Sequence, residues 1–159
     1  MAFTLRVLFL LCGISGLFTG VLSNDSKKKD SCCPEGWTRL DDHCYVVKDD
    51  PRTFADAEEV CQLLHGNLAS VTSAVKNAVV YQLVLEENLS SAWIGYHDAL
   101  QNSDFLWTDG SDPDAFVNFA GGSPTDSGDC VIITTDGEWS DVDCETTEAY
   151  ACITDVCCH

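Results

Sequence analysis

Basic residues and proline are scarce in this sequence. Only 8 of the 159 residues are Lys or Arg, against 26 Asp and Glu, and the formal net charge is −18. A polyanion of this strength is repelled by nucleic acids and by anionic bilayers, so a nucleic-acid partner is excluded. With 4 prolines and 45% hydrophobic residues, the composition is that of one globular domain rather than of a disordered or collagen-like chain.

Long apolar runs are absent after residue 22. The one such run, residues 7–22, follows Arg6 and is 16 residues long, which is shorter than the roughly 20 residues of a membrane-spanning helix. We therefore expect residues 1–23 to be a signal peptide, with a membrane anchor as the alternative. Residues 24–31 then form a flexible polar leader, and residues 32–159 form a secreted, extracellular domain with a short Cys-containing C-terminal tail and no membrane insertion.

Motifs of metal and catalytic sites are also missing. The 10 cysteines include no Cys-x-x-Cys pair, and so many thiols outside metal-ligand spacing indicate an oxidising compartment. The four histidines lack the i, i+4 spacing of a zinc helix, and the sequence has no Gly-x-Ser-x-Gly elbow, no phosphate loop and no cysteine placed beside a histidine as an obvious nucleophile. The sequence therefore predicts that the protein is not an enzyme.

Carboxylates dominate the second half of the chain. Residues 77–159 contain sixteen Asp and Glu and no Lys or Arg. Carboxylates at this density repel one another, so the fold must either keep them in water or neutralise some with a cation. A solvated acidic face and a metal site both remain possible interpretations.

Two helices are indicated in the first half of the domain. Thr53 followed by Asp56 resembles a capping box, apolar residues then recur at helical spacing, and Gly66 provides a left-handed stop. This pattern predicts a helix over residues 54–65. Ser73 begins a second amphipathic segment that extends to residue 86.

Strands are predicted later in the chain, from aromatic and β-branched runs. The predicted strands are residues 93–96, 105–108, 131–135, 138–142 and 148–154. Asp136-Gly137 indicates a hairpin with a two-residue primed turn. Residues 109–129, rich in Gly, Ser, Asp and Pro, form an irregular loop of a length that is usually functional. The fold class is therefore α+β, with two helices, small antiparallel sheets and a long irregular binding loop.

Several landmarks in order resemble the C-type lectin-like domain. They cover about residues 33–154 and are Cys33-Pro-x-Gly-Trp37, Cys44-Tyr45, Cys61, Trp93-Ile94-Gly95, Trp107-Thr108-Asp109-Gly110, Cys130, Trp139-Ser140-Asp141, Cys144 and Cys152. The short layout is similar to soluble fish lectins, type II antifreeze proteins and snake-venom lectins. The resemblance implies a disulfide-stabilised binding domain.

The resemblance also implies a disulfide pairing. It joins Cys33 to Cys44, Cys61 to Cys152 and Cys130 to Cys144. Cys32, Cys157 and Cys158 are then left at the two chain ends, which lie close together in this family. One of the last two cysteines is expected to join Cys32, and the remaining thiol indicates a disulfide-linked homodimer or a capped or buried thiol.

The expected binding loop departs from the family. Sugar-binding members present Glu-Pro-Asn or Gln-Pro-Asp and a Trp-Asn-Asp triplet, which chelate calcium and two sugar hydroxyls, whereas this chain has Ser123-Pro124-Thr125 and Trp139-Ser140-Asp141. Hydroxyls in place of amides and carboxylates weaken a calcium site. A poorer Ca²⁺ site could use Asp126, Asp129, Ser140 and Asp141. The resemblance implies a cis peptide bond at Pro124, and an ordinary turn proline is the alternative.

Three functions remain open. The first is a secreted lectin that binds a glycan or glycoprotein through the long loop, with a divergent calcium site that is weak or absent. The second is a domain that binds a protein ligand through the apolar loop residues Phe116, Val117 and Phe119. The third is an ice-binding protein, although the additional loop cysteines of the antifreeze relatives have no counterpart here. The sequon at Asn88 predicts a glycan if that residue is exposed.

Overall fold

The computed structural model describes residues 31–98, 104–125 and 128–158. The predicted signal peptide, nearly all of the polar leader and Asp126 lie outside the described residues. The helices and strands in chain order are β1 (Ser31–Cys32), β2 (Thr38–Leu40), β3 (His43–Arg52), α1 (Phe54–Leu63), β4 (Asn67–Leu68), α2 (Ala74–Glu86), β5 (Ser91–His97), β6 (Leu106–Trp107), β7 (Cys130–Thr134), β8 (Trp139–Val142), β9 (Glu148–Asp155) and β10 (Cys157–Cys158).

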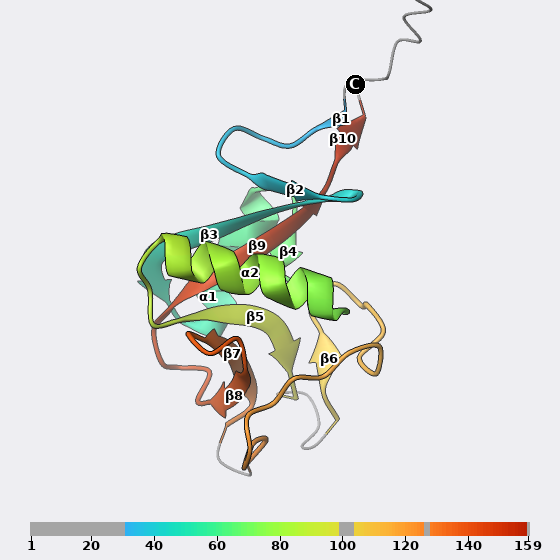
Figure 1. Cartoon of the computed structure of the whole chain (residues 1–159). Coiled ribbons are helices and arrows are strands. Elements are labelled where there is room, and N and C mark those ends of the chain that lie inside the picture. The colour runs from blue at the N-terminus through green and yellow to red at the C-terminus, as the bar shows by residue number, and fades with distance from the viewer. Residues whose placement is uncertain (1–30, 99–103, 126–127, 159) are drawn as a thin grey trace, which may run out of the picture.

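One eight-stranded sheet forms the centre of the domain (Figure 1). Its strands run in the order β2-β3-β9-β5-β7-β8, with β4 also paired to β9 and β6 to β5. The contact between β5 and β9 is parallel, so the sheet is mixed. β1 and β10 pair separately as a two-stranded ribbon.

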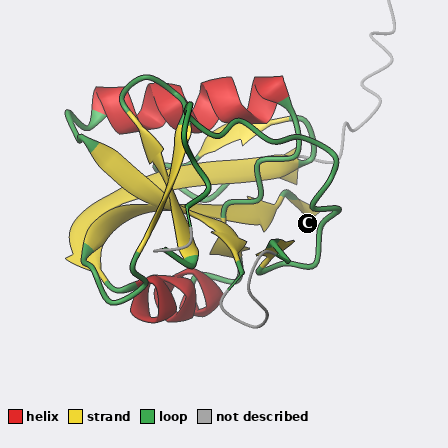
Figure 2. Ribbon diagram, turned by 90° about the horizontal axis from the view of Figure 1, so that it is seen from below, coloured by secondary structure: helices red, strands yellow, loops and turns green. Residues whose placement is uncertain are grey.

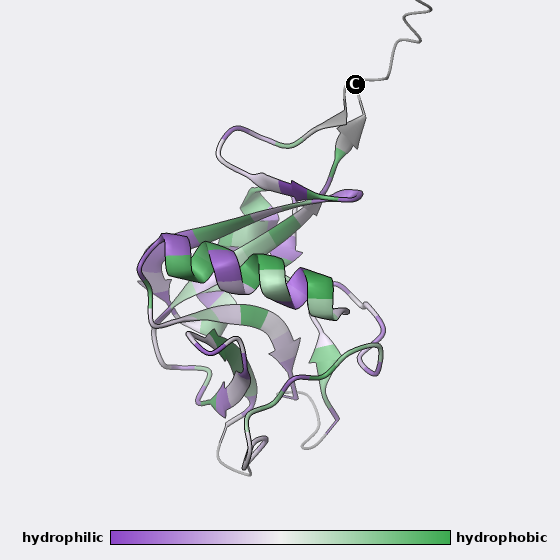
Figure 3. Cartoon of the chain, viewed as in Figure 1, coloured by the Kyte–Doolittle hydropathy of each residue, from purple (hydrophilic) through white to green (hydrophobic). Residues whose placement is uncertain are grey.

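The two helices lie on opposite sides of the strands (Figure 2). On the side of α2, Val80 and Val84 join a core cluster that contains Tyr96, Trp107 and Trp139. On the side of α1 a second cluster surrounds the Cys61–Cys152 disulfide. Figure 3 shows hydrophobic segments along β3, β7 and α2. The α+β class predicted from the sequence is confirmed.

Local capping begins both helices where the sequence predicts. The Thr53 hydroxyl accepts a hydrogen bond from the Asp56 amide at 3.3 Å, and the Ser73 hydroxyl accepts one from the Lys76 amide at 3.2 Å. Each bond satisfies an amide that has no partner within the first turn of its helix. The helix starts can be predicted from the sequence because each capping hydroxyl lies only three residues before the amide that it caps.

The end of α1 differs from the prediction. The left-handed residue is His65, with φ of 64°, and the amides of His65 and Gly66 donate to the carbonyls of Gln62 and Cys61 in a Schellman motif. Gly66 is required for another reason, because a Cβ there would overlap the carbonyl oxygen of Ile153 in β9. The close approach of β9, not local backbone handedness, accounts for this glycine.

The turn between β7 and β8 is also not the predicted one. The Gly137 amide donates to the Thr134 carbonyl at 2.9 Å, and the Thr134 amide donates to the Glu138 carbonyl at 3.0 Å. Within this turn only Gly137 has a positive φ, of 75°. The hairpin therefore has a three-residue loop ending in a left-handed glycine, which adds one residue to the predicted two-residue primed turn.

The three predicted disulfides are confirmed. Cys33 is bonded to Cys44, Cys61 to Cys152 and Cys130 to Cys144, with Cα separations of 5.5, 5.5 and 5.1 Å. The second of these joins α1 to β9 across 91 residues of sequence. The third begins at Cys130, the first residue of β7, directly after the long loop.

Candidate functional site

The long loop, residues 109–129, connects β6 to β7 and packs on β8. The rings of Phe116 and Phe119 meet that of Trp139 edge to face, with centroids 5.6 and 5.9 Å apart. The Ala120 amide donates to the Trp139 carbonyl at 2.9 Å, and the Trp139 amide donates to the Asn118 carbonyl at 2.9 Å. The loop is thus attached to β8 by both backbone and aromatic contacts.

Trp139 supports the loop from below. Its side chain is completely buried, and its indole N–H donates to Oδ1 of Asn77 at 2.8 Å. The side-chain amides of Asn77 and Asn118 both donate to the carbonyl of Gly137, each at 2.8 Å. The strand pattern favours Trp139 as a core residue at the border of the predicted ligand-binding loop, and in the structure its side chain is a core residue beneath that loop.

The predicted site residues that do meet are Thr125 and Asp141. The Thr125 amide and hydroxyl donate to Oδ2 of Asp141 at 2.8 and 2.6 Å. Asp141 is buried in β8, whereas Thr125 is exposed on the loop. We call this contact the Thr125–Asp141 clamp, because two hydrogen bonds to one carboxylate oxygen hold the end of the loop against the sheet.

The clamp shifts the acidity of Asp141. Burial alone raises the pKa of a carboxyl group, but the hydrogen bonds from the Thr125 hydroxyl and amide outweigh it and lower the pKa of Asp141. The carboxylate is therefore ionised at neutral pH. It accepts hydrogen bonds from Thr125 without needing a proton of its own.

We expect this lowered pKa to make the clamp sensitive to acid. The unfolded chain has an Asp pKa of about 3.9, so ionised Asp141 stabilises the fold above that pH, and the contribution is lost as the pH falls through the lower folded value. The free energy of unfolding of the wild type, minus that of Asp141→Asn, is then constant above about pH 4 and shrinks below it. Urea denaturation across a pH series measures this difference. Parallel pH curves for the two proteins would contradict the assignment.

The other predicted site residues take different positions. The hydroxyls of Ser123 and Ser140 lie 3.4 Å apart beside the clamp, and the Ser123-Pro124 peptide bond is cis, as the resemblance implied. Asp129 is exposed, and its carbonyl accepts a hydrogen bond from the Asp98 amide at 2.9 Å. The structure therefore gathers Ser123, Thr125, Ser140 and Asp141 into one polar patch.

The described residues of this patch do not fit a calcium ion. Calcium takes six to eight oxygen ligands, several of them charged. Oδ2 of Asp141 is occupied by Thr125, and Oδ1 is a single buried oxygen without a hydrogen-bond donor. Across residues 31–98, 104–125 and 128–158, no three His, Cys, Asp or Glu side chains gather closely enough to hold a metal.

Gly128 is a site residue that sequence reasoning missed. It is buried, and a Cβ there would overlap the Val142 amide and lie 2.6 Å from the carbonyl carbon of Asp141. Asn77 was also missed, because its contacts with Gly137 and Trp139 span about sixty residues. A glycine within a loop already rich in glycine gives no signal of a close backbone contact.

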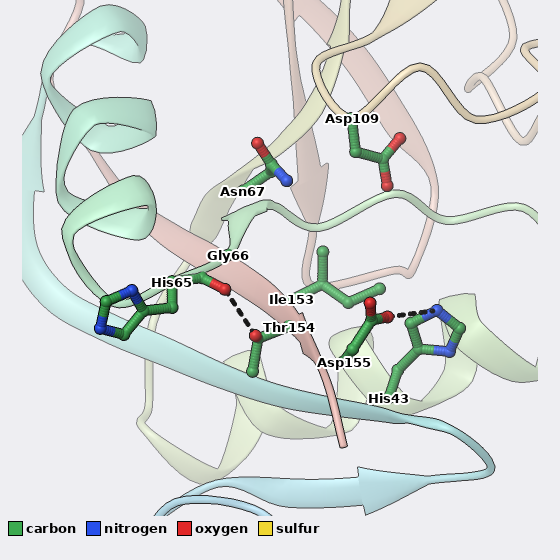
Figure 4. A pocket seen from close by; sticks show the side chains of 8 residues that line it. All are labelled: His43, His65, Gly66, Asn67, Asp109, Ile153, Thr154 and Asp155. Atoms are coloured by element: carbon green, nitrogen blue, oxygen red, sulfur yellow. Dashed lines mark hydrogen bonds and ion pairs between the residues drawn. The ribbon is translucent and has the colours of Figure 1, made fainter. Parts of the chain in front are cut away.

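A second, polar pocket of about 260 Å³ lies near the ends of α1 and β9 (Figure 4). It contains the His43–Asp155 pair, whose Nε2 and Oδ1 atoms are 3.6 Å apart, and Asp109 faces it from the start of the long loop. The Asp155 side chain is 92% exposed, and such a pair contributes at most about 1 kcal/mol. The His43–Asp155 pair therefore contributes little to holding this pocket in shape.

Asn88, the acceptor residue of the predicted glycosylation sequon, is exposed, as glycosylation requires. It lies just after α2, in a left-handed conformation with φ of 57°. Glycosylation at Asn88 stays a prediction. In the part of the chain that the structure describes, no helix combines the length and apolar character needed to cross a membrane.

Comparison with known proteins gives a consistent picture. Residues 50–154 match the family described as "Lectin C-type domain". Human lithostathine-1-beta is 34% identical over 128 residues, which cover 76% of this chain and 76% of the relative. The family is non-enzymatic, in agreement with the prediction from the sequence.

Two solved structures share the fold of this chain. The cow C-type carbohydrate-recognition domain of CD23, determined in the presence of GlcNAc2Man3 oligosaccharide, has a TM-score of 0.72 and 26% identity, covering 80% of this chain and 99% of that one. A Ca²⁺-dependent type II antifreeze protein in its Ca²⁺-free form has a TM-score of 0.71 and 26% identity, covering 77% and 99%. The relatives thus include a carbohydrate-recognition domain and a calcium-dependent protein. With its three disulfides, two helices and mixed sheet, this chain belongs to the C-type lectin domain family.

Proposed function

We propose that this protein is a secreted carbohydrate-binding domain whose long loop recognises a glycan without calcium. The observation that carries the proposal is the Thr125–Asp141 clamp. It holds the loop in place through hydrogen bonds within the chain, and it lies beside two serine hydroxyls. A polar patch of this kind suits a ligand that is itself covered with hydroxyl groups.

The chemistry of the patch supports a sugar ligand. Hydroxyl groups both donate and accept hydrogen bonds, as do the hydroxyls of a sugar. The loop presents Ser123 and Thr125, and β8 presents Ser140 next to them. The exposed carboxylate of Asp129 adds an acceptor close to the start of β7.

The clamp replaces what a cation would do at this position. A calcium ion would need the carboxylate of Asp141 as a charged ligand, but Thr125 donates two hydrogen bonds to that group. The Thr125 hydroxyl points its proton at Oδ2 of Asp141, which is the oxygen that a cation would bind. The residues present therefore favour a loop that is ordered without metal.

The alternative of a protein ligand has less support. Of the three apolar loop residues that it would use, Phe116 and Phe119 are half-buried against Trp139, and only Val117 is exposed. One exposed valine is a small anchor, because protein interfaces usually rely on larger buried aromatic groups.

A glycan array probed with the labelled mature protein tests the proposal. We expect binding in buffer containing EDTA, and we expect Gly128→Ala to weaken it at least about tenfold, which corresponds to about 1.4 kcal/mol. The added Cβ pushes the loop away from Asp141 and Val142. The matched control is Gly121→Ala in the same loop, where a Cβ meets no atom within 4 Å.

The outcomes of this experiment separate the alternatives. Gly121→Ala should bind as the wild type does, and thermal unfolding of both variants shows whether the domain stays folded. Failure of the folded wild type to bind any glycan would overturn the proposal. Equal binding by Gly128→Ala and Gly121→Ala would show that the sugar binds elsewhere.

Calcium titration is a separate test of the clamp. We expect isothermal titration of Ca²⁺ into the chelator-treated, oxidised protein to give no saturable heat up to several millimolar, because the described donor set is too small and Asp141 is engaged. Asp141→Ala serves as the control and should behave in the same way. Saturable heat in the wild type that disappears in Asp141→Ala would establish a metal site and contradict a calcium-free loop.

A further inference from the structure

The two ends of the domain meet in a short ribbon that contains three cysteines. β1 and β10 pair antiparallel, with Cys32 opposite Cys157 and Ser31 opposite Cys158. In Figure 1 this ribbon projects from the body of the domain beyond β2. The other six cysteines of the described chain are already joined in three disulfides.

The backbone register places Cys32 and Cys157 at a separation suitable for a disulfide. Directly opposed residues of an antiparallel pair have Cα atoms about 4.5 or 5.5 Å apart, depending on whether they exchange hydrogen bonds. A disulfide needs about 4.4 to 6.8 Å, so either kind of pair is compatible. The three disulfides of this domain have Cα separations of 5.1 to 5.5 Å.

Cys158 is left over when Cys32 and Cys157 are joined. It is paired with Ser31 rather than with a cysteine. Its other cysteine neighbour, Cys157, is adjacent in sequence, and Cα atoms of adjacent residues are only about 3.8 Å apart, which is below the disulfide range. The sequence after residue 23 contains nine cysteines, so at least one of them has no partner within the chain.

We propose that Cys32 and Cys157 form a fourth disulfide within the chain and that Cys158 joins Cys158 of a second copy in a covalent dimer. A single disulfide between two copies of the same residue is compatible with a twofold dimer, because that residue then lies on the symmetry axis. The inference does not depend on sugar binding, because the ribbon uses none of the residues of the Thr125–Asp141 clamp.

The formation of the Cys32–Cys157 bond and that of the Cys158–Cys158 bond are both two-electron oxidations of a pair of thiols. In each, two thiols lose two protons and two electrons as one S–S bond forms, and a disulfide of an oxidoreductase or of glutathione accepts them and becomes two thiols. Such donors belong to the oxidising compartment that the cysteine content indicates.

The charge distribution favours contact at the ribbon. Two bodies that each carry an excess of carboxylates repel one another. Lys27, Lys28 and Lys29 precede Cys32 by three to five residues and are three of the 8 basic residues of the chain. In sequence, residues 24–31 contain three Lys and two Asp and are therefore far less acidic than residues 77–159, which contain sixteen Asp and Glu and no Lys or Arg.

The test uses the full chain secreted from a host cell, analysed by denaturing electrophoresis with and without reductant and by peptide mapping. We expect the wild type to run at twice the monomer mass until it is reduced. Cys158→Ser should be a monomer without titratable thiol, with Cys32 linked to Cys157. Cys32→Ser is the matched control, and it should remain a covalent dimer.

Several results would overturn the proposal. These are a monomeric wild type with one titratable thiol or a glutathione adduct, a covalent dimer in Cys158→Ser, and loss of the dimer in Cys32→Ser. Thermal unfolding of each variant checks that the domain is folded. Because six cysteines of the core remain in every variant, failure to fold is not the expected result, and light scattering of the reduced proteins reports any association that needs no disulfide.

Discussion

Replacing both Cys61 and Cys152 by alanine is expected to leave the domain largely unfolded at physiological temperature. In the chain-entropy model, a disulfide that closes a loop of about 90 residues stabilises a protein by about 4–5 kcal/mol. Small domains have a total stability of about 5–15 kcal/mol. Both cysteines are completely buried between α1 and β9, so their loss also leaves unfilled space in the core. Circular dichroism during thermal and urea denaturation measures the effect.

The matched control is the double replacement of Cys33 and Cys44. This bond closes a segment with a sequence separation of 11, for which the same model gives about 3 kcal/mol or less. The control should therefore remain folded with a lowered midpoint. Equal destabilisation of the two double variants would contradict the dependence on loop length.

Gly66→Ala is expected to destabilise the domain by about 3 kcal/mol or more, because insertion into a site already filled by backbone is at the costly end of overpacking. The new Cβ would overlap the Ile153 carbonyl oxygen and lie 3.0 Å from its carbon, and neither atom can move without shifting β9. Denaturant unfolding measures the loss.

Two controls separate crowding from backbone handedness. Gly121→Ala places a Cβ in open space and should change stability by less than about 0.5 kcal/mol. His65→Gly places glycine at the left-handed residue of the Schellman motif, where glycine is the preferred residue, and it should leave the domain folded. A loss of less than about 1 kcal/mol in Gly66→Ala would show that β9 does not press on this position.

The positions of the helices could be predicted from the sequence because their signals are local. Thr53 and Ser73 cap amides three residues away, and that spacing is visible in the sequence. β3 was not predicted, although it is the longest strand. Its second half contains Asp49, Asp50 and Pro51, and it is held as a strand by its pairing with β9, about a hundred residues later.

The candidate site was only partly predictable. The sequence pointed to Ser123, Thr125, Ser140 and Asp141 as a group, and the structure brings them together. It could not indicate that Thr125 occupies the Asp141 carboxylate, because that depends on how the loop is seated on β8. Nor could it indicate that Phe116 and Phe119 are the rings that pack against Trp139, since those contacts depend on how the loop folds back on β8.

The sequence by itself determined the fold class, the helix starts, the extent of the long loop and the family. These follow from caps, apolar periodicity and ordered landmarks, which are short-range or recognisable as a pattern. Only the tertiary structure decided which residue ends α1, why Gly66 and Gly128 must be glycine, and which carboxylate the loop engages. Each of these depends on a contact between segments that are distant in sequence, and the energy of such a contact exists only once β8 and β9 are in place.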